Sequence, residues 1–525
     1  MKSEYDLVVA GAGAAGLLAA AAATRLGYDV LVVEASDLVG GTNAGARGAM
    51  WLPGNSLQEK AQLADSSADA LDYLNEVLGE PTEISTPARR AAFVETAPKL
   101  AAWLLNSRLP LTIMRGLPDH YPNCANARDQ GRVLAMHHID RSTLGPDADR
   151  LRTADVVNSS PLDSLPLLSR VKGAKASLSR GESLVAELFR RTQANGVEVR
   201  YHSPVCDLVV EDGRATGGVV DCDGAKTRIA ARGGVLLACG GFEGDQRLRE
   251  EHLPLPTSVE WSLNNGVNHG AALALAQAHD LATANLDDAW WVPVIMVDHR
   301  PYRIDHARRA AHSLLVDQVG DRFYNETAPA AVLGQHLYAR SRSVRAVPSY
   351  LIMDARHRQA QALGPWKAGS NLRRALEGQD IHKASTLNEL AAEIGVDPPG
   401  LLGSVVRFNG FAAKGRDADF SRGESSWDRY GLGGSRKKNP SLGKVDKAPY
   451  WAVAVYPGDT GTKGGLVVDA DAVVRRVDGS PVTGLYACGG AAASLSEHTA
   501  PGPGAGLAEA MVQAYRAVLD IHARR

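Results

Sequence analysis

The feature that most constrains the fold is a glycine-rich turn near the N-terminus, within "YDLVVAGAGAAGLLAAAAATRLGYDVLVVEAS" at residues 5–36. The apolar run at residues 7–10 predicts a buried strand. The alanine-rich stretch after the turn predicts a helix to about residue 26, which Gly27 ends, and residues 30–33 predict a second strand. Strand, helix and strand in this order predict an α/β fold built on a parallel sheet.

Three glycines in this turn have the spacing Gly-x-Gly-x-x-Gly, which is typical of dinucleotide-binding sites. Gly11 permits the tight turn, Gly13 lets the backbone approach a pyrophosphate, and Gly16 lets the helix pack against the strand. Glu34 follows the second strand, where an acidic side chain accepts hydrogen bonds from a ribose. The predicted dinucleotide contacts in this segment are Gly11, Gly13, Ala14, Ala15, Gly16 and Glu34.

Further glycine-rich segments favour FAD over NAD. One of them, "DLVGGTNAGARGAMWLPGN", lies at residues 37–55, and apolar strands within residues 233–245 and 482–494 both end in glycines. Ligands of open α/β sheets bind beyond the carboxyl ends of the strands, so these ends predict one long ligand that touches several of them. FAD has the required length. Further contacts are predicted at Gly41, Thr42, Gly48, Val205, Cys239, Gly240, Gly489 and Gly490.

Composition narrows the class of partners. The chain of 525 residues exceeds one ordinary domain and predicts two. Its 57 basic and 59 acidic side chains give a formal net charge of -2 without a long run of one sign, which argues against a nucleic-acid partner. The 15 histidines show no metal-binding signature, so we expect no metal site.

Two features bear on the location of the protein. Five cysteines without a Cys-x-x-Cys pair predict a reducing compartment and no disulfide scaffold. The uncharged run at residues 7–23 resembles the core of a signal peptide, but Glu4 and Asp6 precede it and the glycine motif interrupts it. We therefore predict a cytoplasmic protein without a transmembrane segment.

Several longer motifs are more specific than the glycine turn. They include "GGTNAGARGAMWLP", "DDAWWVP", "DRFYNETAP" and the C-terminal "HTAPGPGAG". With these motifs, nearly the whole chain resembles the 3-ketosteroid dehydrogenase-like branch of the fumarate reductase/succinate dehydrogenase flavoprotein superfamily. The resemblance implies a Rossmann-like FAD-binding domain formed by residues 1–282 and 448–525. An α+β substrate domain, inserted at residues 283–447, is expected to cap the FAD site.

The resemblance also implies a reaction, the FAD-dependent formation of a C=C bond next to the ketone of a cyclic, 3-ketosteroid-like substrate. A base takes a proton from the α carbon, and the β hydrogen leaves as a hydride to flavin N5. In the family, the glycine at the place of Gly504 donates its backbone N–H to the ketone oxygen. This residue begins the last predicted helix, where N–H groups have no intrahelical partner. We expect the amides of Gly506 and Leu507 to face the flavin.

Two positions depart from the family pattern. The steroid 1-dehydrogenases carry tyrosines, as the base and as a second donor to the ketone, where this chain has Ala330 and Ala500. Alanine side chains neither donate nor accept hydrogen bonds. We therefore expect a cyclic ketone that differs from the common steroid substrates. The remaining catalytic candidates are Tyr121, His120 and Tyr338, with Tyr324 and His498 as further alternatives.

Two other functions stay open at this point. The first is the reduction of an activated alkene such as fumarate, since the relatives that do so bind carboxylates through arginine and histidine. The second is FAD binding without desaturation, which the two missing tyrosines motivate. The sequence does not identify the electron acceptor. The aromatic residues of the insert are expected to favour core positions over the substrate site. The insert contains the arginines Arg303, Arg308, Arg309, Arg340 and Arg407.

Overall fold

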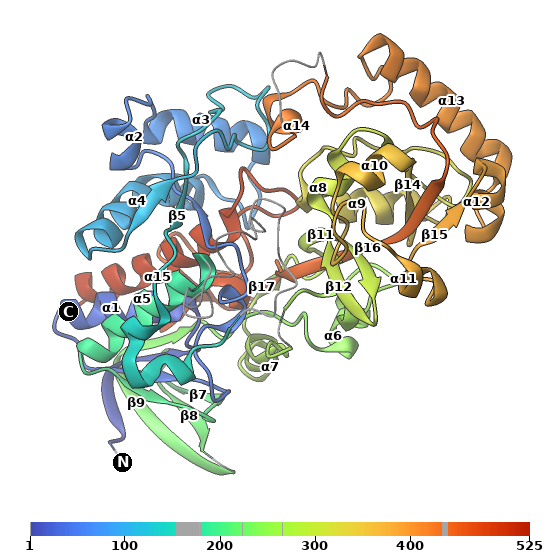
Figure 1. Cartoon of the computed structure of the whole chain (residues 1–525). Helices are drawn as coiled ribbons and strands as arrows, with labels where there is room; N and C mark the ends of the chain where they lie inside the picture. Colours follow the sequence, from blue (N-terminus) through green and yellow to red (C-terminus); the bar gives the residue numbers. More distant parts are fainter. Residues whose placement is uncertain (1, 154–177, 179, 223, 265, 433–438) are drawn as a thin grey trace.

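The protein combines a mostly parallel sheet, covered by helices, with a second sheet that is antiparallel (Figure 1). Both chain termini lie beside the first sheet, and the yellow and orange middle of the chain forms most of the second (Figure 1). The predicted α/β class is confirmed. The computed structural model describes residues 2–153, 178, 180–222, 224–264, 266–432 and 439–525.

The first sheet contains the glycine-rich segment. β1 (Glu4–Ala10) pairs in parallel with β2 (Val30–Val33) on one side and with β9 (Ala225–Leu237) on the other. β19 (Pro481–Ala487) pairs in parallel with β9, so strands from both ends of the chain share one sheet. The apolar run of β2 is buried throughout, as expected for the interior of a parallel sheet. The other strands of this sheet are β6 (Glu198–Arg200), β7 (Val205–Glu211), β8 (Arg214–Cys222) and β18 (Val473–Arg475).

Three helices pack together over the first sheet. α1 (Ala14–Arg25) begins directly after the glycine motif and contacts α5 (Arg180–Ala194) and α15 (Ala505–Ala523) (Figure 1). The many alanines of α1 are buried, because small side chains let neighbouring helices approach closely. This arrangement brings the first and last helices of the chain side by side.

β16 (Tyr450–Thr462) bears on the expected division of the chain into an FAD-binding half and an insert. This strand pairs antiparallel with β11 (Ala289–Val297) and β14 (Ser349–Met353), so it lies at the centre of the second sheet. A division at residue 448 would instead assign it to the FAD-binding half. We propose that the FAD-binding half resumes only after residue 462. The other strands of the second sheet are β12 (Arg300–Arg303), β13 (Ser313–Val316) and β15 (His382–Ala384).

A third, small sheet that the sequence did not predict lies between residues 49 and 136. It consists of β3 (Ala49–Trp51), β4 (Leu111–Ile113) and β5 (Val133–Met136). Its core includes Trp51, whose ring stacks on Phe93 with centroids 5.8 Å apart. The helices of this region are α2 (Ser56–Lys60), α3 (Ser67–Leu78) and α4 (Pro87–Asn106).

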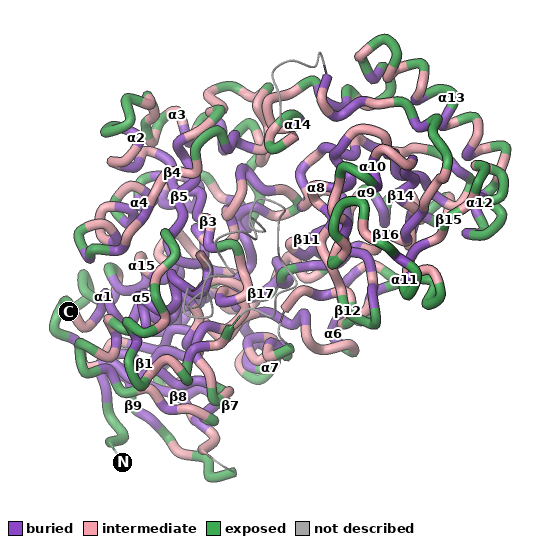
Figure 2. Tube along the Cα trace, viewed as in Figure 1, coloured by how far each residue is buried: buried purple, intermediate pink, exposed green. Residues whose placement is uncertain are grey.

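Buried residues follow the strands of both main sheets, whereas the outer helices α12 (Leu387–Ile394) and α13 (Pro398–Lys414) each bury one face and expose another (Figure 2). Among the described residues, no helix combines the length and the apolar character that a membrane span requires. The remaining helices are α6 (Gln246–His252), α7 (Ala271–Ala278), α8 (Asp305–Arg309), α9 (Ala330–Ser341), α10 (Ala355–Ala360), α11 (Arg373–Glu377) and α14 (Ser426–Arg429). The short elements are β10 (Thr283–Ala284), β17 (Gly465–Leu466), η1 (Gly41–Asn43), η2 (Arg141–Arg150), η5 (Val259–Trp261) and η6 (Gly489–Ala491).

Candidate active site

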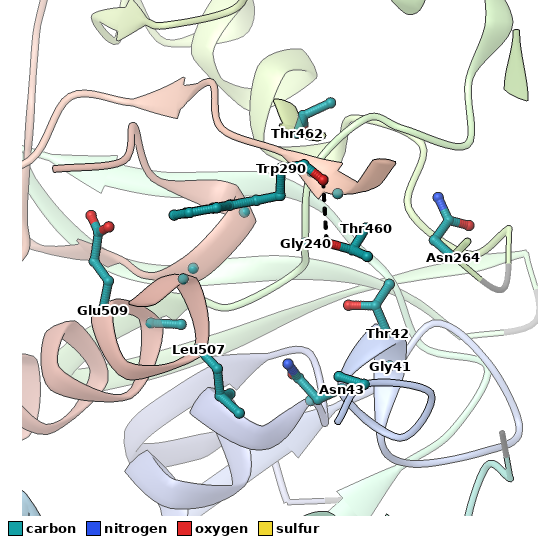
Figure 3. Close-up of a pocket in the computed structure, with 18 of the residues that line it drawn as sticks. Gly41, Thr42, Asn43, Gly240, Asn264, Trp290, Thr460, Thr462, Leu507 and Glu509 are labelled. Atoms are coloured by element: carbon teal, nitrogen blue, oxygen red, sulfur yellow. Dashed lines mark hydrogen bonds between the residues drawn. The ribbon is translucent and has the colours of Figure 1, made fainter. Parts of the chain in front are cut away.

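A cavity of about 680 Å³ is lined by residues from both halves of the molecule. One wall comes from the glycine motif, the ends of β9 and β19 and the start of α15, and the other from β11, α8 and α14. In Figure 3, Trp290 extends from its strand across the cavity, and Gly41, Thr42 and Asn43 lie on a separate wall. This volume is in the range of cofactor and ligand pockets.

Close backbone contacts shape the glycine motif. Gly11 has a φ of +110°, and a Cβ there would lie 2.4 Å from the carbonyl oxygen of Ala238. A Cβ on Gly16 would lie 2.0 Å from the carbonyl oxygen of Gly11, so α1 packs directly on the turn, as the sequence predicts. Glu34 holds the same turn, since its Oε2 accepts a hydrogen bond from the N–H of Ala12 at 2.8 Å. Only glycine fits at Gly11 and Gly16.

Most of the predicted FAD contacts line the cavity, but Ala14 and Gly16 do not. The N–H of Ala14 donates to Oδ1 of Asn43 at 3.2 Å, and Gly16 is used in packing. These two residues therefore make contacts within the protein and do not face the cavity. The predicted residues that line the cavity are Gly11, Gly13, Ala15, Glu34, Gly41, Thr42, Gly48, Val205, Cys239, Gly240, Gly489, Gly490, Gly506 and Leu507.

The first turn of α15 presents backbone donors to the cavity. Gly504 precedes the helix with a φ of +82°, and it lines the cavity together with Gly506 and Leu507. Among the described residues, no acceptor takes the backbone N–H of any of these three. The positive end of the helix dipole adds to their attraction for negative charge.

The chemistry of the cavity fits FAD. The glycine motif leaves no space for a Cβ at Gly11, and Glu34 stands where a ribose hydroxyl would donate. The N–H groups at the start of α15 suit an electron-rich ring edge. A dinucleotide with a flavin ring would use all three features, and these residues would hold it.

Replacing Glu34 with alanine is expected to weaken FAD binding about 10- to 100-fold, because the buried N–H of Ala12 loses its acceptor and the ribose loses its partner. FAD titration, followed by the quenching of flavin fluorescence, measures this change. Asp37→Ala is the matched control, since it removes an exposed carboxylate three residues further on and should leave binding unchanged. Equal dissociation constants for the two variants would contradict the assignment of Glu34.

His120 is the catalytic candidate with an ionisable side chain on the cavity wall. Its Nδ1 lies 2.9 Å from the carbonyl oxygen of Ala500. Because a carbonyl oxygen only accepts, Nδ1 carries the proton and Nε2 keeps its lone pair. Burial lowers the pKa of His120 to about 4, against the effect of the Ala500 carbonyl, and the charge of Arg309 adds to the shift. The imidazole is therefore neutral at pH 7, and Nε2 can accept a proton.

Buried polar contacts hold the loop of His120 against the segment before α15. Asp119 accepts hydrogen bonds from Nε1 of Trp51 at 2.7 Å and from Nη1 of Arg132 at 2.8 Å. Trp51 also lies directly under Gly502, where a Cβ would approach its ring to 2.4 Å. The same side chain thus supports both the loop of the imidazole and the segment that leads to Gly504.

The structure does not bring Tyr121 or Tyr338 to the cavity wall. The hydroxyl of Tyr121 pairs with that of Thr499, and the hydroxyl of Tyr338 donates to the carbonyl oxygen of Pro256 at 3.0 Å. Burial raises the pKa of both tyrosines. Tyr338 lies eight positions after Ala330, which lines the cavity, and this places the tyrosine about 12 Å further along the axis of α9.

The two further alternatives, Tyr324 and His498, do not line the cavity either. Tyr324 is buried, and its hydroxyl has no hydrogen-bond partner among the described residues. Nδ1 of His498 lies 3.3 Å from Oδ2 of Asp288, which also binds Lys463. The hydrogen bond to Asp288 raises the pKa of His498. His498 is therefore placed to position the segment before α15 rather than to meet a substrate.

Two aromatic residues of the insert, where aromatic side chains are expected to favour the core, line the cavity beside His120. The ring of Trp427 meets the imidazole edge to face, with centroids 4.4 Å apart, and Tyr430 follows three residues later. Arg309 also packs on Trp427, with its guanidinium carbon 4.9 Å from the centroid of the indole ring. Aromatic residues in an insert occur more often in cores, so the sequence offered no distinguishing signal for this pair.

Comparison with known proteins decides the family. Residues 6–507 match the FAD binding domain family. The chain is 33% identical to a 3-oxosteroid 1-dehydrogenase of Mycobacterium tuberculosis, over 99% of this chain and 98% of the relative. It belongs to the 3-oxosteroid 1-dehydrogenase family of flavoproteins. The family resemblance found in the sequence and the prediction of FAD as cofactor are both confirmed.

Two further comparisons support membership of the 3-oxosteroid 1-dehydrogenase family. The crystal structure of 3-ketosteroid delta1-dehydrogenase from Sterolibacterium denitrificans, in complex with 1,4-androstadiene-3,17-dione, covers 100% of both chains with a TM-score of 0.92 and 33% identity. A 4-oxocyclohexanecarboxylate 2-dehydrogenase of Sinomonas cyclohexanicum is 32% identical over 98% of this chain and 92% of the relative. The chain is accordingly an FAD-dependent oxidoreductase that acts on CH–CH groups, and the Rossmann-like FAD-binding fold is confirmed.

Proposed function

We propose that the chain introduces a C=C bond next to the ketone of a cyclic substrate, with Gly504 and His120 as the reacting protein groups. The observation that carries this proposal is the presence of both residues on one cavity, beside the predicted flavin contacts. Together they supply what the reaction requires from the protein: a donor to the ketone oxygen and an acceptor for the α proton.

Gly504 is proposed to polarise the ketone. Its backbone N–H donates to the ketone oxygen, on which negative charge develops as the α proton leaves. The positive end of α15 stabilises this charge further. A backbone donor of this kind contributes on the order of 3 kcal/mol in the transition state.

His120 is proposed to take the α proton at Nε2. The imidazolium that forms keeps its Nδ1–H bond to the carbonyl oxygen of Ala500, which favours the positive charge. When bound, FAD supplies the acceptor for the β hydrogen, which leaves with the electron pair of its C–H bond. The electrons of the broken α C–H bond remain on the substrate and complete the C=C bond.

We propose a cyclic ketone other than a common steroid as the substrate. The relatives named above act on 3-oxosteroids and on 4-oxocyclohexanecarboxylate, so the family accepts ring ketones of different size. Ala330 and Ala500 line the cavity at the positions where the resemblance implies tyrosines. The ketone end of this cavity therefore lacks two hydroxyl groups.

Anaerobic mixing of the FAD-loaded protein with a panel of ring ketones tests the proposal. Loss of the oxidised flavin absorbance is expected with at least one non-steroidal ring ketone. Rapid bleaching by a 3-keto-4-ene steroid would instead show that the two alanines do not change the substrate class.

The two alternative functions have separate signatures. Flavin that stays oxidised with every ketone of the panel would favour an FAD-binding protein without desaturase activity. Consumption of a reduced viologen dye with fumarate would favour an alkene reductase. The cytoplasmic location stays a prediction from the sequence. A panel of artificial and natural oxidants, tested on the reduced flavin, would identify the electron acceptor.

The rate of flavin reduction is expected to fall in acid only near pH 4. Burial and Arg309 hold the pKa of His120 at about 4, and only the neutral imidazole accepts the α proton, so activity is full above this pKa and is lost below it. Stopped-flow measurement of kcat/KM after a brief pH jump gives the profile of the free enzyme. A midpoint near 6.5, the value of a solvated imidazole, would contradict the assignment of the base.

A further inference from the structure

Helix α8 places two neighbouring guanidinium groups on the cavity wall. Arg308 and Arg309 both line the cavity, and they are only 1% and 8% exposed. Buried arginines usually have a carboxylate or another anion beside them, because removing a charge from water is costly. The partners of these two residues therefore decide what the wall can bind.

Neither guanidinium forms an ion pair with any described carboxylate. Arg308 donates through Nη1 and Nη2 to the carbonyl oxygens of Glu326 and Ala328, and its Nε has no partner. Arg309 donates through Nη2 to the carbonyl oxygen of Trp427, and its Nε also has no partner. Nη1 of Arg309 makes no hydrogen bond within the described chain, and Arg309 is one of the residues that line the cavity. This nitrogen is thus an available donor.

The carboxylates near α8 are already engaged. Asp305 binds Nε of Arg303 at 2.7 Å and lies 3.9 Å from Arg47. Although burial opposes its ionisation, the charges of Arg303, Arg47 and Arg308 hold the pKa of Asp305 well below its usual range. Asp428 accepts hydrogen bonds from Gly423 and Asn325, so it and Asp305 favour the charge of Arg309 only from beyond ion-pair distance. The positive charges of α8 thus remain in excess on this wall.

The excess charge lies close to the base. The guanidinium carbon of Arg309 is 4.9 Å from the centroid of the Trp427 ring, and Trp427 packs edge to face with the imidazole of His120. Tyr430, whose hydroxyl makes no hydrogen bond within the described chain, lines the same wall. An anion held by Nη1 of Arg309 would therefore share the Trp427 wall of the cavity with the imidazole that takes the α proton.

From this geometry we infer that Arg309 binds a carboxylate of the substrate, with the charge of Arg308 behind it, so that the substrates are ring ketones that carry an acid group. The inference rests on the proposed function for the ketone, but it concerns the binding of the other end of the molecule. Nη1 of Arg309 donates to the carboxylate in a charge-assisted hydrogen bond. A neutral steroid would leave Nη1 of this buried guanidinium without a charged acceptor.

Binding of the carboxylate also serves the base. Arg309 disfavours a second positive charge on His120, and an anion on Arg309 cancels this effect. The substrate itself would then raise the basicity of the imidazole at the moment when it must accept a proton. Esters and neutral ketones would lack this assistance.

Binding to the oxidised, FAD-loaded protein tests the inference without any turnover. The probes are 4-oxocyclohexanecarboxylate and its methyl ester, and flavin difference spectra give both dissociation constants. We expect the acid to bind about 100-fold more tightly than the ester, and Arg309→Gln to remove most of that difference. Arg309→Lys, which keeps the charge, should retain part of it. Arg407→Gln is the matched control, since it removes one positive charge from an exposed residue of α13 outside the cavity.

The outcomes separate this inference from the proposed function. Equal affinities of acid and ester in the wild-type protein would overturn it, as would an Arg309→Gln variant that still holds FAD and keeps the preference. Tight, Arg309-dependent binding of the acid without flavin bleaching would support the carboxylate site and contradict the proposed reaction. Bleaching by neutral ring ketones alone would support the reaction and overturn the carboxylate site.

Discussion

Replacing Gly504 with alanine is expected to lower the rate of flavin reduction by a ring ketone about 100- to 1000-fold or more. Gly504 has a φ of +82°, and a Cβ there would lie 2.2 Å from the carbonyl oxygen of Ala49 and 2.8 Å from the nitrogen of Met50. Both contacts are to the backbone of β3, which cannot move aside like a flexible side chain. The N–H that polarises the ketone must therefore shift, and the stabilisation of the developing oxyanion is lost with it.

Stopped-flow flavin reduction in variants loaded with FAD to the same extent measures this effect. Gly213→Ala is the matched control, because Gly213 has a φ of +76° in a turn of the first sheet with no atom near the added Cβ. It imposes similar backbone strain, of about 1 to 2 kcal/mol, without moving a donor. A Gly504→Ala variant that keeps more than a tenth of the wild-type rate would exclude the backbone donor.

Replacing His120 with asparagine is expected to lower the same rate about 100- to 10,000-fold, since proton transfer to a positioned base contributes this much. The amide nitrogen of asparagine takes the place of Nδ1 and can still donate to the carbonyl oxygen of Ala500. What the variant lacks is the lone pair of Nε2. FAD content and the unfolding temperature should therefore change little, and the loss should appear in the chemical step.

Tyr121→Phe is the matched control for this variant. The hydroxyl of Tyr121 is directed to Thr499 and away from the cavity, so its removal should leave the rate within about threefold of wild type, because no proton transfer is lost. If Tyr121→Phe instead loses activity and His120→Asn does not, the neighbouring tyrosine is the base. An intermediate loss of the flavin-reduction rate in both variants would indicate that the loop containing His120 and Tyr121 acts as a unit.

The FAD-binding half was predictable because its signals are local. The spacing of Gly11, Gly13 and Gly16 encodes a turn whose close contacts the structure shows directly. The strand at residues 30–33 and the start of α1 follow from apolar runs on either side of that turn. Each of these features depends on residues within one short segment, which is where sequence patterns are most informative.

The substrate end was harder to predict because its residues meet through tertiary contacts. His120, Trp427 and Arg309 come from three distant segments, and their sequence neighbourhoods show no shared pattern. Tyr338 has the helical spacing of a cavity residue, but spacing gives the face of a helix and not the depth at which the cavity ends. Likewise, β16 begins two residues after the predicted domain boundary, and only its pairing with β11 and β14 assigns it to the second sheet.

A crystal structure of the FAD-loaded protein with a bound ring keto acid tests the central claim most directly. The account predicts that the ketone oxygen accepts a hydrogen bond from the N–H of Gly504, with the α carbon facing Nε2 of His120. A ketone oxygen bound elsewhere in the cavity, or an α carbon that faces a different side chain while His120 points away, would contradict it.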